Sequence, residues 1–158
     1  MNSDEQMQQL QKRLRNVEDM LEISQLLASY GPLVDSGNAE ATAALWAEDG
    51  EYDVPGLRMR SRNEIRAMVL SDSHKNLIET GSAHFIGPPH VVVDGDKAVA
   101  VCESILVLRE DDSYRILLSG SHNIQLQRLA GQWKITRRIT RELNGDACAR
   151  ELLRAELS

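Results

Sequence analysis

Four side chains with the chemistry of proton transfer stand out in the first half of the sequence. Tyr30 and Asp35 fall near the end of an apolar helical pattern, Tyr52 follows in EDGEYD, and His84 lies in SAHFIG. A carboxylate that accepts a hydrogen bond from one ring nitrogen of a histidine fixes the tautomer and makes the other nitrogen a better base. Tyrosine hydroxyls can stabilise an oxygen that gathers negative charge. The set therefore predicts abstraction of a proton from carbon by His84, oriented by Asp35.

Each of these residues also has an ordinary structural interpretation. A histidine between Ala83 and Phe85 is commonly a hydrogen-bonded residue of the core or of a strand edge, and an aspartate at a helix end is common as well. Tyrosines often lie at the edge of a core with the hydroxyl in water. The catalytic hypothesis depends on the four occurring together, and a domain that only binds a small molecule remains an alternative.

Arg138 and His122 extend the candidate site into the second half of the chain. Arg138, in WKITRR, is suited to hold an anion or a leaving group, or else is a solvated arginine at a strand end. In a strand of period two, only one of His122 and Asn123 can face a cavity, and His122 shares its face with Leu118. We therefore favour His122 as a substrate contact.

Three further residues complete the candidate substrate-binding set. Leu118 lies on the same strand face as His122, and Trp46 lies in the apolar segment ALWAEDG. Glu103 interrupts an apolar run, and it is either a carboxylate of the pocket or an ion-pair partner at a subunit contact.

Composition and motifs exclude several other classes of function. The net charge is −6 and the sequence has no run of Lys or Arg, so we expect no nucleic-acid partner. There is no glycine-rich phosphate loop, G-x-S-x-G or H-E-x-x-H, and no pair of histidines or cysteines has metal-ligand spacing. We expect no metal and no cofactor. The polar N-terminus lacks the apolar core of a signal peptide and no segment is long enough to span a membrane, which favours a cytoplasmic protein with reduced cysteines.

The hydrophobic pattern predicts helices first and long strands afterwards. Apolar residues spaced by three and four predict a first helix that is buried more deeply in its second half, and Ser36-Gly37-Asn38 is expected to end it. A short helix that includes Trp46 follows, then short strands at 51–54 and 57–60, a helix behind the capping box that begins at Ser61, and a loop over 71–80.

Period-two segments then predict strands over 83–93 (broken near Gly87-Pro88-Pro89), 98–109, 114–129 and 132–141. This order indicates an α+β fold in which a curved antiparallel sheet wraps around the N-terminal helices and leaves a cone with an open end, a natural pocket for a small molecule.

The segments that carry these residues resemble a known family. VEDMLEISQLLASYGPLVDSGN, ALWAEDGEYDVPG, AHFIGPPHVVVDGDKA and GSHNIQLQRLAGQWKITRR occur between residues 17 and 138, in the order and spacing of SnoaL-like members of the nuclear transport factor 2-like superfamily. The similarity is greatest to the branch that holds scytalone dehydratase, bile acid 7α-dehydratase and hexachlorocyclohexane dehydrochlorinase. The resemblance implies a cone-shaped α+β barrel, which we place over 17–143, and a homo-oligomer, with a trimer favoured over a dimer. We expect an N-terminal helical extension over 1–16 before the barrel and, after it, a C-terminal helix over 144–158 that matches nothing in the family.

The resemblance also implies roles for individual residues. Asp35 and His84 match the catalytic dyad of the family, Tyr30 and Tyr52 match tyrosines of the pocket, and Arg138 matches an arginine used in the dehydrochlorinase. The chain departs from the family pattern G-x-Y-x-D at 120–124, where His122 replaces the tyrosine and an isoleucine replaces the final polar residue. This departure bears on substrate specificity and leaves the dyad intact.

Together these observations predict a cofactor-independent lyase, a dehydratase or a related β-eliminating enzyme, that acts on a small and largely apolar substrate. An isomerase or an aldol-type cyclase would use the same proton abstraction and is the enzymatic alternative.

Overall fold

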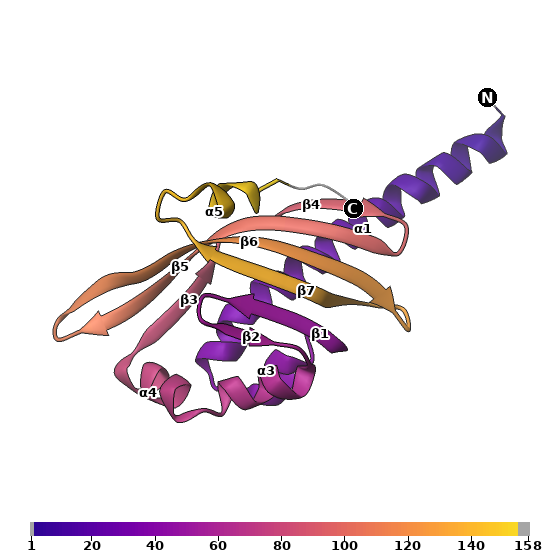
Figure 1. Ribbon diagram of the computed structural model, residues 1–158. Coiled ribbons are helices and arrows are strands. Elements are labelled where there is room, and N and C mark those ends of the chain that lie inside the picture. The colour runs from indigo at the N-terminus through magenta and orange to yellow at the C-terminus, as the bar shows by residue number, and fades with distance from the viewer. Residues whose placement is uncertain (1, 155–158) are drawn as a thin grey trace.

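The first element is a long helix, α1 (Ser3–Asp35), in the computed structural model, which describes residues 2–154. Its N-terminus is closed by a capping box, in which the Asn2 side chain accepts from the Glu5 amide at 2.8 Å and the Glu5 carboxylate accepts from the Asn2 amide at 2.9 Å. Ile23, Leu27 and Val34 are buried, whereas the apolar side chains of the first half are exposed. The predicted difference between the two halves is confirmed, and the exposed half projects beyond the body of the molecule (Figure 1).

The turn after α1 follows the predicted chemistry. Gly37 has a φ of +69°, a conformation that glycine adopts without strain, and α1 ends just before it. The Asn38 side chain then accepts from the Ala41 amide at 3.1 Å and caps α2 (Ala39–Ala43). Trp46 was predicted to lie on this short helix, and the structure instead places it at the start of the first strand.

A seven-stranded sheet packs against the helices. Its strand order is β2-β1-β7-β6-β5-β3, with β4 also paired to β5. Neighbouring strands are antiparallel except β1 and β7, which run parallel and bring Tyr52 opposite Arg138. The predicted break at Gly87-Pro88-Pro89 separates β3 from β4. The strands are β1 (Trp46–Val54), β2 (Leu57–Met59), β3 (Ser82–Ile86), β4 (His90–Asp94), β5 (Lys97–Glu110), β6 (Ser113–Leu129) and β7 (Gln132–Glu142).

Two helices connect β2 to β3. The side chain of Ser61 caps α3 (Arg62–Val69), as predicted. The segment 71–80 was predicted to be a loop, and this is wrong, because it forms α4 (Asp72–Thr80) with the Ser71 hydroxyl accepting from the His74 amide at 3.3 Å. The polar composition of the segment hid a single apolar edge that faces the body of the protein.

The elements enclose one core between α1 and the sheet. In Figure 1, α1, α3 and α4 lie on one side of the sheet and the short helix α5 (Ala147–Glu151) lies on the other. The α+β fold with an N-terminal helix and a curved sheet is as predicted. Residues 155–158, which belong to the predicted C-terminal helix, lie outside the described residues. None of the helices in the described part of the chain is both long and apolar enough to cross a membrane.

Candidate active site

Asp35 and His84 form a hydrogen-bonded pair where the end of α1 meets β3. The Asp35 carboxylate accepts from the His84 ring through Nδ1 at 2.6 Å and from the His84 backbone amide at 2.7 Å. A carboxylate accepts only, so Nδ1 carries the proton and, in the neutral ring, Nε2 carries the lone pair. His84 lines a cavity between α1 and the sheet whereas Asp35 does not, which places the carboxylate behind the ring.

Gly31 allows this contact between helix and strand. A Cβ at this position would lie 2.2 Å from the His84 carbonyl oxygen, well inside the closest distance that real Cβ atoms reach. The residue before Pro32 therefore has no side chain because the backbone of β3 passes directly against α1. That close passage brings His84 within reach of Asp35, one helical turn further along.

The cavity lies between α1, the sheet and the β1–β2 hairpin, and its volume is about 200 Å³. Seven polar side chains line part of the cavity, and the rest of its wall is aliphatic, which suits a small and largely apolar molecule. The polar residues are Tyr30, Tyr52, His84, Ser104, His122, Arg138 and Thr140, and the apolar ones are Val54, Pro55, Leu57, Met59, Met68, Ile105, Leu106 and Leu118.

The guanidinium of Arg138 lies over the rings of both tyrosines at the inner end of the cavity. The guanidinium carbon of Arg138 lies 4.2 Å from the centre of the Tyr30 ring and 4.8 Å from that of Tyr52, which are cation–π distances. The Tyr30 ring also meets the His84 ring edge to face at 6.1 Å. The parallel pairing of β1 with β7 makes this arrangement possible, because it sets Tyr52 beside Arg138.

His122 connects Arg138 to Ser104 through its two ring nitrogens. Arg138 Nε lies 3.3 Å from His122 Nδ1, and a guanidinium only donates, so Nδ1 is the acceptor. Nε2 then bears the hydrogen and donates to Ser104 Oγ at 2.6 Å. Thr140 Oγ1 lies 2.8 Å from Nδ1 as well. This arrangement requires a neutral imidazole.

Burial and charge perturb two groups in this cluster. Burial lowers the pKa of His122 well below its ordinary value, and the positive charge of Arg138 lowers it further. Burial raises the pKa of Tyr30 well above its ordinary value, and the neighbouring Tyr52 raises it further, although Arg138 opposes the change. The Tyr30 hydroxyl therefore keeps its proton and can donate a hydrogen bond at neutral pH.

The structure brings together most of the residues that the sequence indicated. Six of them line the cavity: Tyr30, Tyr52, His84, His122, Arg138 and Leu118. Asp35 does not line it but is hydrogen-bonded to His84, which does. The Asn123 side chain is on the other face of β6, where it donates to the carbonyl of Leu152 at 3.2 Å. The period-two argument that favoured His122 therefore gives the observed orientation.

Two predicted substrate contacts lie outside the cavity. Glu103 is exposed and is absent from the lining, because alternation along β5 directs Ser104 into the cavity and Glu103 away from it. Trp46 is fully buried behind the tyrosines, with its ring 5.3 Å from that of Tyr52 and 5.9 Å from that of Tyr30. The structure corrects both assignments, since Trp46 supports the pocket without lining it.

Three residues of the site escaped the sequence analysis. Ser104 and Thr140 complete the contacts of His122, and Thr140 lies two residues after Arg138 on the same strand, so alternation could have identified it. His74 is buried on α4, where its Nε2 donates to the carbonyl of Val34 at 3.1 Å and its ring lies 6.0 Å from that of His84. Nothing in the polar segment around His74 indicated this position.

Residues 2–154 contain no cluster of three or more histidine, cysteine, aspartate or glutamate side chains suited to a metal ion.

Comparisons with other proteins agree with this fold. Residues 15–139 match the sequence profile of the SnoaL-like domain. A nuclear transport factor 2-like protein with a cystatin-like fold from Novosphingobium aromaticivorans is 40% identical, with a TM-score of 0.89 over 92% of this chain and 95% of that one. No protein of curated function matches the sequence.

Two further solved structures share the fold at lower identity. A protein of unknown function from Mycobacterium tuberculosis is 25% identical, with a TM-score of 0.74 over 91% of this chain and 96% of that one. A candidate scytalone dehydratase from Novosphingobium aromaticivorans is 22% identical, with a TM-score of 0.67 over 80% of this chain and 85% of that one.

Proposed function

The chain belongs to the SnoaL-like family of the nuclear transport factor 2-like fold, and from that premise we propose that it is a cofactor-independent lyase, a dehydratase or a related β-eliminating enzyme. The observation that carries the proposal is that the His84 ring lies between the Asp35 carboxylate and the cavity. The carboxylate holds Nδ1–H at 2.6 Å, and the imidazole faces a space lined mainly by apolar side chains. The name of the candidate scytalone dehydratase with the same fold is in keeping with this reaction class.

In the proposed reaction, His84 Nε2 removes a proton from a carbon beside the group that stabilises the resulting charge. The Tyr30 and Tyr52 hydroxyls donate to the oxygen that becomes negative. Elimination expels a hydroxide equivalent from the neighbouring carbon. The proton held by His84 leaves with that oxygen as water, so the residues return to their starting protonation states.

The proposal is tested by screening small apolar hydroxy compounds and recording the mass of each product. A loss of 18 mass units per turnover, the mass of water, supports elimination, whereas a product of unchanged mass indicates an isomerase or a cyclase that uses the same base. The variant His84→Ala should lower kcat by about 10²–10⁴-fold, the usual contribution of a general base.

The matched control is His90→Ala, because His90 is an exposed histidine at the start of β4 that does not line the cavity. Its turnover should equal that of the wild type. Full activity in a folded His84→Ala protein would overturn the mechanism, and ligand binding without turnover of any compound would favour a binding domain.

A further inference from the structure

Arg138 is a buried cation without a countercharge. Its side chain is 1% exposed, and no carboxylate among the described residues lies within ion-pair distance of it. Arg141, three residues further along β7, shows the ordinary solution, because it binds the Asp53 carboxylate through two nitrogens at 2.9 and 3.0 Å. Burial of an unpaired charge is costly, so an arginine in the position of Arg138 needs a partner that the chain does not supply.

The contacts of Arg138 leave one end of its guanidinium unused. Its guanidinium carbon lies over the rings of Tyr30 and Tyr52, and Nε donates to neutral His122, whereas Nη1 is buried without any hydrogen-bond partner among residues 2–154. Cation–π contacts compensate part of the cost of burial, and they leave the N–H donors unsatisfied. Nη2 likewise has no hydrogen-bond partner among these residues and, unlike Nη1, is not sealed from solvent, so a ligand in the cavity that Arg138 lines is the available acceptor.

Ser104 offers a second donor beside the first. Its Oγ accepts the hydrogen of His122 Nε2 at 2.6 Å, so its own hydroxyl hydrogen is free to point elsewhere. Ser104 also lines the cavity. His122 thereby sets the direction of both groups, since one nitrogen fixes Arg138 and the other fixes Ser104. The inner end of the cavity presents donors and a positive charge, and the carboxylate of Asp35 remains behind His84.

We propose that the inner end of the cavity binds a carboxylate carried by an otherwise apolar ligand, with Arg138 and Ser104 as its donors and His122 as the residue that positions them. A carboxylate brings one negative charge to one positive charge, and its planar shape matches a guanidinium. A phosphate monoester carries about −1.5 to −2 charges near neutral pH, which would leave excess negative charge among aliphatic side chains. This inference rests on the proposed function in one respect: it takes the carboxylate ligand to be the substrate, whose acidic C–H would face His84.

Calorimetric binding to the full chain at pH 7.5 tests the proposal. The probes are benzoate, phenylacetate and 2-naphthoate, each compared with the amide of the same skeleton, which has the same shape and no charge. At least one carboxylate should bind tenfold or more tightly than its amide. The variant Arg138→Gln should lose that preference, while Arg137→Gln should keep it, because Arg137 lies near Glu51 and outside the cavity.

Two further variants keep the test decisive. Ser104→Ala should weaken carboxylate binding severalfold, and it removes a single hydroxyl, so the result stands even if Arg138→Gln does not fold. His84→Ala should retain carboxylate binding while losing turnover, which separates this proposal from the lyase mechanism. Equal affinity for carboxylate and amide, undiminished binding by folded Arg138→Gln, or no binding of any carboxylate in the panel would overturn it.

Discussion

Asp35 contributes to the site through two hydrogen bonds to a single residue. One oxygen accepts from the His84 ring and the other from the His84 backbone, so the carboxylate fixes both the tautomer and the position of the histidine. This double contact distinguishes Asp35 from an aspartate that merely ends a helix. The consequence can be measured separately for chemistry and for stability.

We expect Asp35→Asn to lower kcat by about 10²–10⁴-fold, because an asparagine amide can present its NH₂ group to Nδ1 and favour the wrong tautomer. KM should change little, since Asp35 does not line the cavity. Kinetics on the wild type and the variant measure this effect. Asp49→Asn is the control, because Asp49 is an exposed aspartate of β1, and an undiminished kcat for Asp35→Asn would contradict the assigned role.

His122 should make the stability of the protein depend on pH. Burial depresses its pKa in the folded state, so below about pH 6.5, its ordinary value, the unfolded chain binds the proton first. Stability is therefore present above pH 6.5 and falls as the pH decreases toward the folded pKa, by up to about 1.4 kcal/mol per pH unit.

Urea denaturation at pH 7.5, 6.5 and 5.5 measures this dependence, and His122→Asn should show a smaller loss of unfolding free energy over the same range. The comparison is made as a difference so that contributions common to both proteins cancel. Identical slopes for the wild type and His122→Asn would contradict the neutral, buried assignment.

The sequence revealed the residues of the site with unusual chemistry and missed those whose importance depends on a neighbour. Asp35 and His84 were found because they occur together with two tyrosines in a set suited to proton transfer, and a family resemblance supplied a role for Arg138. Ser104 is unremarkable in a strand, and only the position of His122, on the adjacent strand, gives it a role. Glu103 was misplaced because the sequence does not show which face of β5 the helices cover.

At the scale of elements, the contact between α1 and β3 limits what the site can tolerate. A Gly→Ala change inside a helix normally stabilises by about 1 kcal/mol. At Gly31 the added Cβ would meet the His84 carbonyl oxygen at 2.2 Å, a contact with backbone that cannot rotate away.

Gly31→Ala should therefore destabilise the protein by about 2 kcal/mol or more, the opposite of its effect on an isolated helix, and should lower kcat by displacing His84 from Asp35. Denaturant unfolding and kinetics of the same variant measure both. Ala28→Gly on the exposed face of α1 is the control, because it reports helix propensity alone. A Gly31→Ala protein as stable as the wild type would show that β3 can move without cost.

Local signals predicted most elements, whereas their pairing depends on contacts distant in sequence. The period-two segments and the turns between them gave the run from β5 to β7, and Gly37 and Asn38 gave the end of α1. The parallel pairing of β1 with β7 joins segments more than 80 residues apart, and no local pattern encodes it. The helix α4 was missed because its capping residue, Ser71, lies in a segment whose composition resembles a loop.

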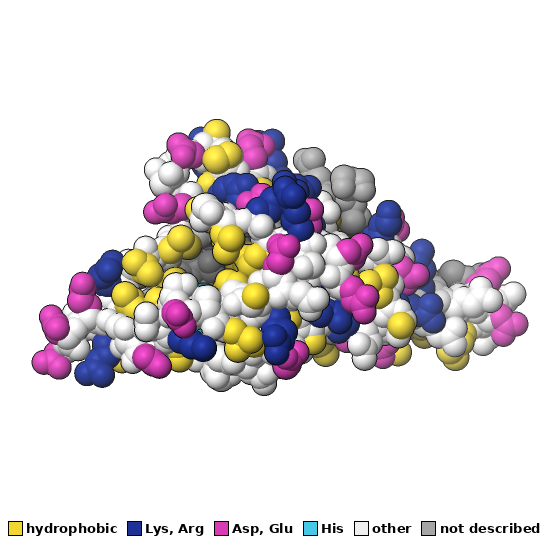
Figure 2. All heavy atoms as spheres, turned by 60° about the horizontal axis from the view of Figure 1, so that its bottom comes forward, with side chains coloured by type: hydrophobic (Ala, Val, Ile, Leu, Met, Phe, Trp, Pro, Cys, Tyr) yellow, Lys and Arg dark blue, Asp and Glu magenta, His cyan; other side chains and the backbone are white. Residues whose placement is uncertain are grey.

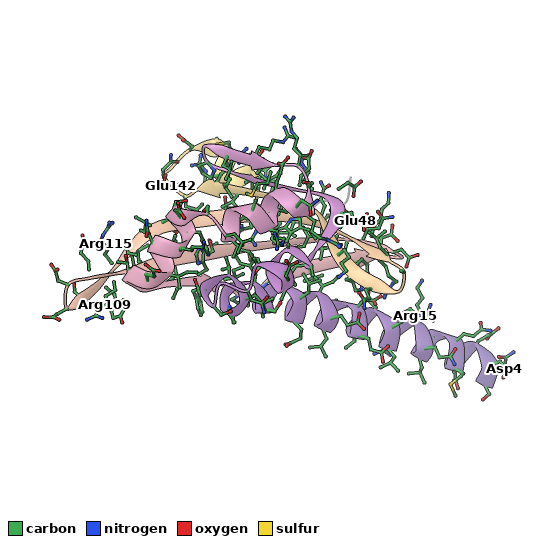
Figure 3. The ribbon with its side chains drawn as sticks, turned by 90° about the horizontal axis from the view of Figure 1, so that it is seen from below. Asp4, Arg15, Glu48, Arg109, Arg115 and Glu142 are labelled. Carbon is green, nitrogen blue, oxygen red and sulfur yellow. The ribbon has the colours of Figure 1, made fainter. Side chains whose placement is uncertain are left out.

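At the scale of the whole molecule, the first half of α1 stands out because its apolar side chains are exposed. An apolar stripe of five side chains, each 56–60% exposed, runs along it: Met7, Leu10, Leu14, Val17 and Leu21. Arg128 anchors the base of this segment by pairing with Asp19 and Asp96. Figure 3 places Asp4 at the end of the helix and Arg109 and Arg115 at the opposite end of the molecule, where charged side chains crowd the tip of the β5–β6 hairpin (Figure 2).

We propose that this stripe is covered by a second copy of the chain, with a trimer favoured over a dimer, because exposed apolar surface of this extent is unusual on a monomer. Light scattering coupled to gel filtration should give a mass above that of one chain, 17.7 kDa. Leu10→Glu with Leu14→Glu should reduce the mass to that of a monomer, whereas Gln9→Glu with Asn16→Glu, off the stripe, should not. A monomeric wild type would contradict the proposal.

The two tryptophans of the chain occupy surroundings that differ optically. Trp46 is sealed against Tyr30 and Tyr52 at the inner end of the cavity, whereas Trp133 lies under the Arg128 guanidinium and donates to Asp19 at 3.3 Å, at the base of the projecting helix. With Trp133 replaced by phenylalanine, the remaining indole emission would come from beside the tyrosines alone. The protein thus carries its own fluorophore for the cavity, and a ligand that enters can be followed by light without any attached dye.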